Sequence, residues 1–291
     1  MIPGRSSITN INSPKLSLII PACNEEGYII RCLESILNQK EVNSGELEVI
    51  VVANNCSDNT VSQAQKLEGR FAERGWRFRI LDIPESGKAN ALNLGDAEAQ
   101  ASTRGYLDAD IVLGPRLIFL SLKALTKADA IFVTARIQIA PARSWLSHRY
   151  GAIFQRLPFM QPGSASGAGW FAVNAAGRKR WQSFPQIISD DTFVRWHFIP
   201  RERVEVDAVY YWPLAEGFNR LVKVRRRQDA GVRELRVLYP ELERNESIPA
   251  VRLIDHLRLL LDEPIGYVIY ASVQLWVRLG DHNQAVWTRG R

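Results

Sequence analysis

The sequence predicts an α/β fold in which helices flank a mostly parallel central sheet and a mainly helical extension follows. Short apolar runs rich in β-branched residues alternate with helical patterns between residues 16 and 110. Parallel neighbouring strands need a crossover connection, and a helix is the usual one, so this alternation indicates a parallel sheet. The 291 residues are 46% hydrophobic, which provides for a large core and excludes a largely disordered protein.

The first strand, helix and strand are the clearest elements. "LSLIIP" at 16–21 and "LEVIVVA" at 47–53 are continuous apolar runs, as expected of strands buried on both faces. Between them, apolar residues of 24–39 recur at helical spacing. The alternation then predicts a helix at 57–75, a strand at 78–83, a helix at 87–101 and a strand at 105–110.

The pattern changes after Asp110. The glycine-, serine- and proline-rich stretch 158–170 is interpreted as a mobile loop, and the C-terminal third is mainly helical in pattern. The other elements predicted here are a helix at 115–127, strands at 130–140, 170–174 and 204–212, and a helix at 190–199 preceded by Ser189.

The charge is concentrated in one segment. The formal net charge is +6, and residues 220–236 hold seven basic side chains against two acidic ones. This local excess suits an anionic ligand or a membrane surface, and we expect no nucleic-acid partner. The three cysteines form no CxxC pair, which indicates neither a disulfide framework nor a structural zinc site.

The two ends of the chain bear on its location. Residues 1–14 are polar, lack the apolar region of a signal peptide, and are interpreted as a flexible leader of a cytoplasmic protein. The apolar run 265–279 is interrupted by Gln274 and Arg278 and is shorter than a membrane span. A core helix is the preferred interpretation. A helix lying on the inner face of the cell membrane or on a partner is the alternative.

Polar side chains follow the predicted strands where those strands end. Ligands of open α/β sheets bind beyond the carboxyl ends of the strands, so these side chains would converge if the strands are neighbours. Asp108 and Asp110 offer hard oxygen ligands that favour Mg²⁺ or Mn²⁺, which could bridge the phosphates of a nucleotide diphosphate. Taken alone, the pair is better explained as the start of a turn. The four sets are Asn24 with Glu25, Asn54 with Asn55, Lys88 with Asn90, and Asp108 with Asp110.

A second carboxylate pair, Asp190 and Asp191, begins a predicted helix. Two acidic residues at the start of a helix are stabilised by the helix dipole. Considered by itself, the pair is therefore explained by helix capping. A transfer reaction nonetheless requires two acidic sites, one to hold a metal and one to take a proton from the attacking hydroxyl.

Six ordered motifs carry a resemblance to a known family. They are "LSLIIPACNEEGYIIRCLESILNQ", "LEVIVVANNCSDNT", "GKANALN", "GYLDADIVLGP", the "GAGW" loop and "ISDDTFV". Over about residues 15 to 200 the chain resembles a family 2 glycosyltransferase of the GT-A fold, which has a Rossmann-like sheet, and six motifs in order are far more specific than one. The resemblance implies a GT-A domain at 15–215, with a nucleotide-sugar half at 15–112 and an acceptor half at 113–215, and a helical extension at 216–291.

The resemblance also implies roles for individual residues. Asp110 would be the main ligand of Mg²⁺ or Mn²⁺, with Asp108 nearer the ribose. Asp191 would be the catalytic base, supported by Asp190. The nucleotide pocket would be lined by Pro21, Ala22, Asn24 and Glu25.

The chain departs from the family pattern in two places, one at the donor site and one in the C-terminal part. The family usually has an acidic residue where this chain reads Ala53, Asn54, Asn55, and a carboxamide both donates and accepts where a carboxylate only accepts. Asn54 is expected in the donor pocket. Uridine is the first choice for the base of the donor, and guanosine and thymidine are the alternatives. The Q-x-x-R-W motif and spanning helices of processive members are absent from the sequence.

The basic run and two further motifs complete the candidate site. The run could clamp the diphosphate through Arg225, Arg226 or Arg227, and a solvated helix face or a site for anionic lipid head groups fits equally well. Lys88 suits a phosphate or ribose about as well as a plain helix start. Trp170, after Gly169 in the "GAGW" loop, is expected to stack on a sugar, with core packing as the alternative.

The function expected from the resemblance is inverting transfer of a sugar. The donor is a nucleotide diphosphate sugar, UDP-linked by first choice, and the acceptor is a hydroxyl of a glycan or lipid-linked molecule in envelope or exopolysaccharide assembly. A sugar nucleotidyltransferase is the first alternative, although "PACNEEG" stands where its Gly-rich phosphate loop would be. A non-catalytic module that binds nucleotide sugars is the second.

Overall fold

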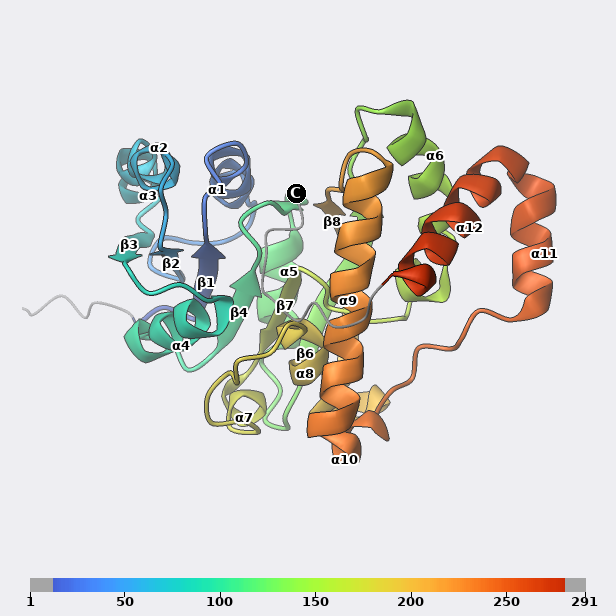
Figure 1. Cartoon of the computed structure of the whole chain (residues 1–291). Coiled ribbons are helices and arrows are strands. Elements are labelled where there is room, and N and C mark those ends of the chain that lie inside the picture. Colours follow the sequence, from blue (N-terminus) through green and yellow to red (C-terminus); the bar gives the residue numbers. More distant parts are fainter. Residues whose placement is uncertain (1–12, 281–291) are drawn as a thin grey trace, which may run out of the picture.

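The computed structural model describes residues 13–280, which form one eight-stranded sheet with helices around it (Figure 1). Most of the expected leader, 1–12, and the last part of the expected extension, 281–291, lie outside the described residues. The strand order is β3-β2-β1-β4-β7-β6-β8-β5. The strands are β1 (Leu16–Ala22), β2 (Leu47–Asn54), β3 (Arg77–Ile83), β4 (Arg104–Leu107), β5 (Val112–Leu113), β6 (Phe132–Ile139), β7 (Trp170–Val173) and β8 (Arg203–Trp212).

The predicted α/β fold is confirmed, and so is a helical C-terminal part. Strands β3, β2, β1 and β4 are parallel, as are β6 and β8, whereas β7 runs antiparallel to both β4 and β6, and β5 to β8. The helices are α1 (Ile29–Leu37), α2 (Thr60–Gln65), α3 (Glu68–Glu73), α4 (Lys88–Glu98), α5 (Leu117–Ala124), α6 (Trp145–Phe154), α7 (Ala175–Arg178), α8 (Asp190–Trp196), α9 (Phe218–Leu238), α10 (Pro240–Glu243), α11 (Leu253–Asp262) and α12 (Pro264–Leu279).

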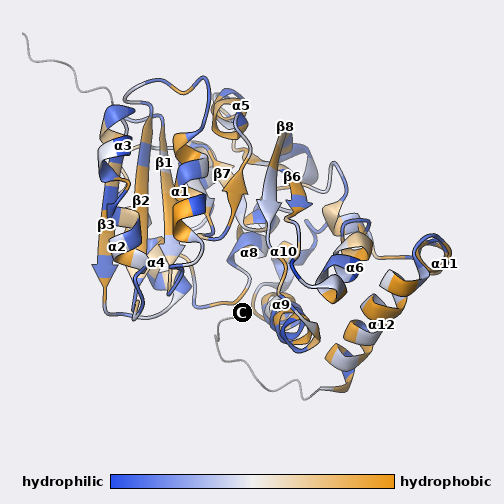
Figure 2. Ribbon diagram, turned by 90° about the horizontal axis from the view of Figure 1, so that it is seen from above, coloured by the Kyte–Doolittle hydropathy of each residue, from blue (hydrophilic) through white to orange (hydrophobic). Residues whose placement is uncertain are grey.

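The apolar runs are continuous because helices cover both faces of the parallel strands. Alternate residues of a strand point to opposite faces. Leu18 of β1 belongs to the same core cluster as residues of α1, α2 and α3, whereas its neighbour Ile19 belongs to another cluster with Leu92 of α4. Figure 2 shows β2 as a largely hydrophobic strand between these layers.

Two predicted elements differ in extent. The single helix expected at 57–75 is two short helices, α2 and α3, and the chain leaves the α-helical pattern at Lys66 and Leu67 between them. The strand expected at 105–110 ends at Leu107, because Asp108 turns the chain and its carbonyl accepts from Ile111 N at 3.1 Å. The two aspartates therefore lie beyond the strand and not on it.

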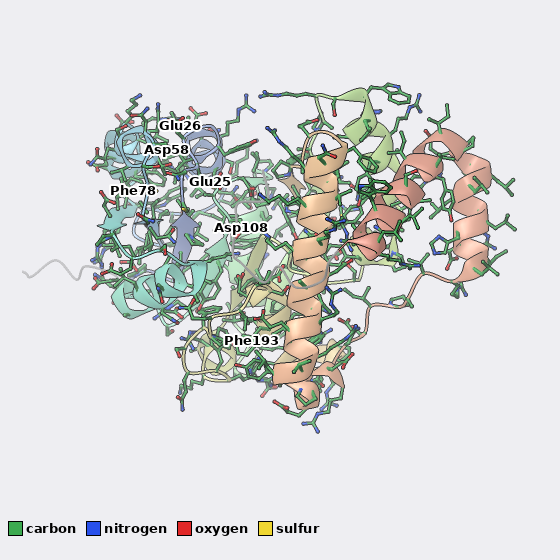
Figure 3. All side chains as sticks on the ribbon, in the orientation of Figure 1. Glu25, Glu26, Asp58, Phe78, Asp108 and Phe193 are labelled. Atoms are coloured by element: carbon green, nitrogen blue, oxygen red, sulfur yellow. The ribbon has the colours of Figure 1, made fainter. Side chains whose placement is uncertain are left out.

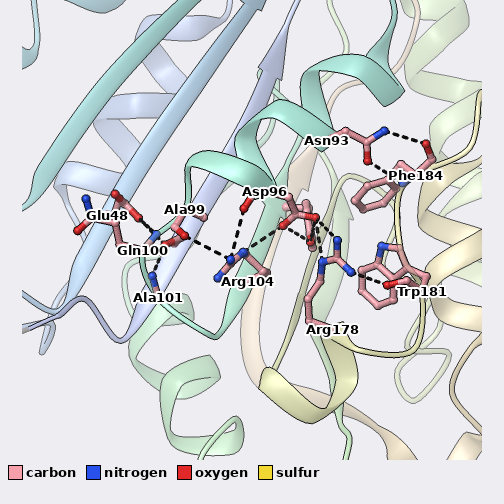
Figure 4. A network of polar contacts seen from close by, with 12 residues as sticks. Glu48, Asn93, Asp96, Ala99, Gln100, Ala101, Arg104, Arg178, Trp181 and Phe184 are labelled. Carbon is pink, nitrogen blue, oxygen red and sulfur yellow. Dashed lines mark hydrogen bonds and ion pairs between the residues drawn. The ribbon is translucent and has the colours of Figure 1, made fainter.

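A buried carboxylate ties α4 to the sheet and to α7 (Figure 4). Asp96, near the end of α4, accepts hydrogen bonds from Arg104 Nε at 3.0 Å, Tyr106 Oη at 2.9 Å and Arg178 Nε at 2.8 Å. Arg178 in turn donates to the carbonyl of Trp181 and packs its guanidinium over that ring. One side chain therefore joins α4, β4 and the segment that leads towards α8.

The C-terminal helices lie at the end of the molecule opposite β3 (Figures 1 and 2). Helix α12 packs against α6 and α9, and α11 packs against α12. The aromatic rings of Tyr150 in α6 and Tyr270 in α12 lie 5.9 Å apart within the main core cluster. This part of the chain therefore continues the core of the domain.

Replacing Asp96 by alanine should destabilise the fold strongly. The substitution leaves Arg104 and Arg178 partly buried without their carboxylate, and breaking a buried ion pair from one side costs about 3 to 5 kcal/mol. Urea unfolding followed by circular dichroism measures the change. Asp207→Ala is the matched control, because Asp207 is 93% exposed and pairs only with Arg136 at the surface. Equal unfolding midpoints for the two variants would contradict the role assigned to Asp96.

Candidate active site

A small pocket lies beyond the ends of β1 and β4, where the first residues of α4 and α8 meet. Its volume is only about 10 Å³ because side chains fill it. Six of the residues expected at the functional site line this pocket: Pro21, Lys88, Asp108, Gly169, Asp190 and Asp191. Apolar residues that the sequence analysis did not single out complete the lining: Leu92, Tyr106, Leu107 and Phe171.

The ammonium group of Lys88 joins the two carboxylate sets. Its Nζ lies 2.7 Å from Oδ1 of Asp108 and 2.9 Å from Oδ1 of Asp190. Burial alone would lower the pKa of Lys88, but the two carboxylates outweigh burial and raise that pKa above its usual value. Lys88 is therefore a fixed positive charge between the end of β4 and the start of α8.

The doublet occupies the first turn of α8. Asp190 is buried, whereas Asp191 is partly exposed and accepts the backbone N–H of Thr192 at 2.6 Å. Burial raises the pKa of both carboxyl groups, and Lys88 opposes the rise. A carboxylate with a raised pKa is a stronger base, which suits proton abstraction from a hydroxyl.

The segment before the doublet is held by two helices. The side chain of Asn93 in α4 accepts Phe184 N at 2.7 Å and donates to Phe184 O at 2.9 Å. From α9, Glu234 accepts Ile188 N at 3.0 Å, and a Cβ on Gly231 would lie 2.3 Å from Ser189 Oγ. Sequence reasoning missed these residues, although Asn93 lies within the quoted "GKANALN" motif.

The aspartates of the D-x-D stretch are positioned by the loop before β7. Asp108 N donates to Gly169 O at 2.9 Å. Gly169 has φ +75°, and a Cβ there would lie 2.8 Å from Ile111 Cδ1, so glycine is required for this close approach. Figure 3 marks Asp108 near the centre of the molecule.

Asp108 and Asp110 could hold a metal ion only if a bound substrate supplied further oxygen ligands. Within residues 13–280, no three His, Cys, Asp or Glu side chains lie close enough together to hold a metal ion. Asp108 and Asp110 supply two carboxylates, and one oxygen of Asp108 is engaged by Lys88. Mg²⁺ is commonly held by one or two carboxylates together with substrate phosphates, and the pair suits that arrangement.

The predicted nucleotide-pocket residues lie at the ends of β1 and β2. Asn24 Oδ1 accepts the backbone N–H of Ser57 at 2.6 Å, and Glu25 N donates to Thr60 Oγ1 at 2.6 Å, so the two loops are joined. Figure 3 labels Glu25 and Asp58 on these two loops. Ala22 and Asn54 are buried and are not among the residues that line the small pocket. A role of these four residues in nucleotide binding stays a prediction.

The expectation that Trp170 stacks on a sugar is wrong. Its side chain is fully buried in the main core cluster, and its ring lies against Gly105 of β4. As the first residue of β7, Trp170 pairs with Leu107, which turns its ring into the core. The alternative, core packing, is the correct interpretation.

Two of the three arginines expected to clamp the diphosphate have partners within α9, in α6 and in α12. Arg225 donates to Asp229 at 2.6 Å and lies over the Phe154 ring, and Arg226 donates to the carbonyl of Trp276. No arginine is among the residues that line the small pocket. A role of Arg225, Arg226 or Arg227 in binding the diphosphate stays a prediction.

The family follows from comparison with known sequences. The family model described as glycosyl transferase family 2 matches residues 17–179, which is more than half of the chain and includes β2, β3, β4 and nearly all of β1. The chain belongs to glycosyl transferase family 2. The resemblance carried by the six motifs is thereby confirmed.

Individual relatives are similar over parts of their length. A chondroitin synthase from Pasteurella multocida is 34% identical over 139 residues, which are 47% of this chain and 14% of that protein. The chain therefore matches a small part of this relative.

Solved structures share the fold. A mannosyltransferase from Pyrobaculum calidifontis, in complex with GDP-Man and Mn²⁺, is 19% identical with a TM-score of 0.59, covering 92% of this chain and 76% of that one. TarS 1–349 from S. aureus, in complex with UDP-GlcNAc, is 17% identical with a TM-score of 0.50, covering 90% and 81%. Identities this low support the GT-A fold alone.

Replacing Asn93 by alanine should lower turnover in a sugar-transfer assay without weakening donor binding. The variant leaves both backbone groups of Phe184 without their partner, so the segment before Asp190 is less well positioned. A displacement of about 1 Å can cost about a hundredfold in rate. Turnover is measured at saturating donor, and the dissociation constant for the donor by calorimetry.

Asn90→Ala is the control for this variant. Asn90 lies in the same helix but contacts only the side chain of Gln186 from that segment, so a smaller effect on turnover is expected. Loss of donor affinity in Asn93→Ala in parallel with turnover would contradict a specific effect on the doublet.

Proposed function

We propose that this chain is an inverting glycosyltransferase that moves a sugar from a nucleotide diphosphate sugar to a hydroxyl group. The observation that carries the proposal is the single pocket in which Lys88 joins Asp108 to the Asp190–Asp191 doublet, in a chain of this family. Donor recognition and proton abstraction require charged groups a few ångströms apart, and this pocket supplies them.

Asp191 is the proposed catalytic base. Its carboxylate takes the proton of the acceptor hydroxyl while that oxygen bonds to the anomeric carbon from the face opposite the diphosphate. The bond from the anomeric carbon to the diphosphate breaks, and its electron pair leaves with the diphosphate. The transition state resembles an oxocarbenium ion, and the anomeric configuration inverts. Asp190, buried behind Asp191 and bound to Lys88, keeps the doublet in place.

Asp110 and Asp108 are the proposed ligands of a divalent cation, Mg²⁺ or Mn²⁺. Such a cation neutralises charge on the departing diphosphate. Lys88 is the proposed partner of the donor phosphates or ribose, because it is the one cation among the residues that line the pocket. The Mn²⁺ in the mannosyltransferase complex supports a metal in this chain without identifying it.

Uridine is the proposed base, and a hydroxyl of a glycan or lipid-linked molecule is the proposed acceptor. Proteins of this fold are recorded with UDP-GlcNAc and with GDP-Man, so the fold is compatible with either base. The similarity to a chondroitin synthase supports a role in polysaccharide assembly. A cytoplasmic location, with a membrane surface as partner, belongs to the same proposal.

Asp191→Asn should abolish transfer and retain donor binding. The carboxamide keeps the size of the side chain but cannot accept the hydroxyl proton, and loss of a general base typically costs about a hundredfold to ten-thousandfold in rate. Release of nucleoside diphosphate in the presence of a sugar acceptor panel measures transfer. Asp207→Asn, at the exposed surface, is the control.

The outcomes separate the rival functions. Normal transfer by Asp191→Asn would refute the assignment of the base. Formation of pyrophosphate from a nucleoside triphosphate by the wild type would indicate a sugar nucleotidyltransferase. Donor binding with neither transfer nor hydrolysis would indicate a binding module.

Asp110→Ala should remove the metal dependence of donor binding. We expect one nucleoside diphosphate of a panel to bind the wild type more tightly with Mn²⁺ than without it, because the cation links carboxylate and phosphates. The variant should bind with and without Mn²⁺ at the weaker, metal-free affinity. Titration calorimetry measures both, with Asp207→Ala as control. Equal Mn²⁺ enhancement in Asp110→Ala would show that Asp110 is not a ligand.

A further inference from the structure

Helix α11 turns its apolar side to solvent. With 3.6 residues per turn, its five exposed aliphatic residues fall within roughly a third of the helix circumference. Their exposed fractions run from 37% to 85%, and the one buried residue of the helix is Leu259 on the other side. The exposed residues are Leu253, Ile254, Leu257, Leu260 and Leu261. An amphipathic helix of a soluble domain normally presents the opposite side to water.

Helix α12 is apolar on two sides. Gly266, Tyr270, Val273 and Val277 are buried, and α12 packs against α6 and α9. The other side is open, with exposed fractions of 52% to 69%. It carries Ile265, Val268, Leu275, Trp276 and Leu279. The sequence analysis offered a core helix or a membrane-facing helix at 265–279. Because α12 buries one side in the core and exposes the other, the two interpretations are compatible.

The charges of α11 are arranged by sign. Arg258 borders the exposed apolar side at helical spacing, whereas Asp255 and Asp262 lie on the side away from it. Both acids pair with arginines: Asp255 with Arg252 at 3.0 Å and Asp262 with Arg156 at 3.3 Å. Of the three charged residues of α11, Arg258 therefore lies nearest to the exposed apolar side.

We propose that the exposed apolar side of α11, together with that of α12, rests on a bilayer that contains anionic lipids. Ten large apolar side chains are exposed on these two helices, which pack against each other, whereas apolar residues exposed singly need no partner. Interfacial helices bury such a side about 5 to 10 Å deep while basic residues meet the lipid head groups. Within residues 13–280, no helix combines the length and the apolar character needed to cross a bilayer.

Charge favours the bilayer over a second copy of the chain. Arg258 lies near the middle of α11, so in a symmetric antiparallel pair built on this helix the two Arg258 side chains would lie close together and repel each other. An anionic lipid surface instead complements Arg258 and the exposed Arg278 of α12. The inference deepens the membrane part of the proposed function and rests on it.

Vesicle co-sedimentation tests the surface. We expect the wild type to bind vesicles of equal parts phosphatidylcholine and phosphatidylglycerol, and to bind pure phosphatidylcholine vesicles more weakly. The pair Leu257→Glu, Leu261→Glu should lower binding by about tenfold or more, because each change removes a buried aliphatic group and adds a charge of the lipids' sign. Val237→Glu, on α9 and 80% exposed, is the matched control and should bind like the wild type.

The outcomes are distinct. Absence of vesicle binding by the wild type, or equal binding by the paired variant, would overturn the proposal. A dimer in sedimentation velocity that the paired variant dissolves, without vesicle binding, would assign the surface to a second copy. Urea unfolding of each variant checks the fold. Transfer to a soluble acceptor without vesicles, measured on the same samples, separates failure of this surface from failure of the proposed enzymatic function.

Discussion

The ion pairs of Lys88 with Asp108 and Asp190 are the constraint on which the candidate site depends. Three carboxylates come together at this edge, from the turn after β4 and the first turn of α8, and without a cation they would repel one another. Lys88 places one positive charge between them at 2.7 and 2.9 Å. The positions of β4 and α8 relative to each other are thus fixed electrostatically where a charged donor would enter.

Helix α4 holds that cation in place and supports the site along its whole length. Lys88 is its first residue, Asn93 in its middle holds the backbone of Phe184, and Asp96 near its end joins Arg104 and Arg178. Its apolar side packs on β1 and β2. Stability and site geometry therefore share one helix, since the segment that leads into the doublet is attached to the same element that carries the lysine.

The sequence was sufficient for the repeating features and insufficient for the long-range ones. Alternation of apolar runs predicted the parallel strands, and strand ends located Asp108 and Lys88. Asn93 and Phe184 lie 91 residues apart, and no local pattern indicates that they meet. Trp170 was misassigned because a glycine-rich loop precedes it, whereas its pairing in β7 decides where the ring points. Pairings of this kind depend on the register of the whole sheet.

Helix α9 connects the candidate site with α12, the helix that carries part of the exposed apolar surface. Near its middle, Gly231 lets the helix approach Ser189 at the start of the doublet. Just over one turn earlier, Arg226 donates to the carbonyl of Trp276 in α12, and a Cβ on Gly280 would collide with its guanidinium. The same helix thus packs against Ile188 and Ser189, directly before the candidate catalytic doublet, and against α12, whose other side is exposed. Helix α9 therefore links α12, which carries the exposed apolar side, to the segment that begins the doublet, without an intervening loop.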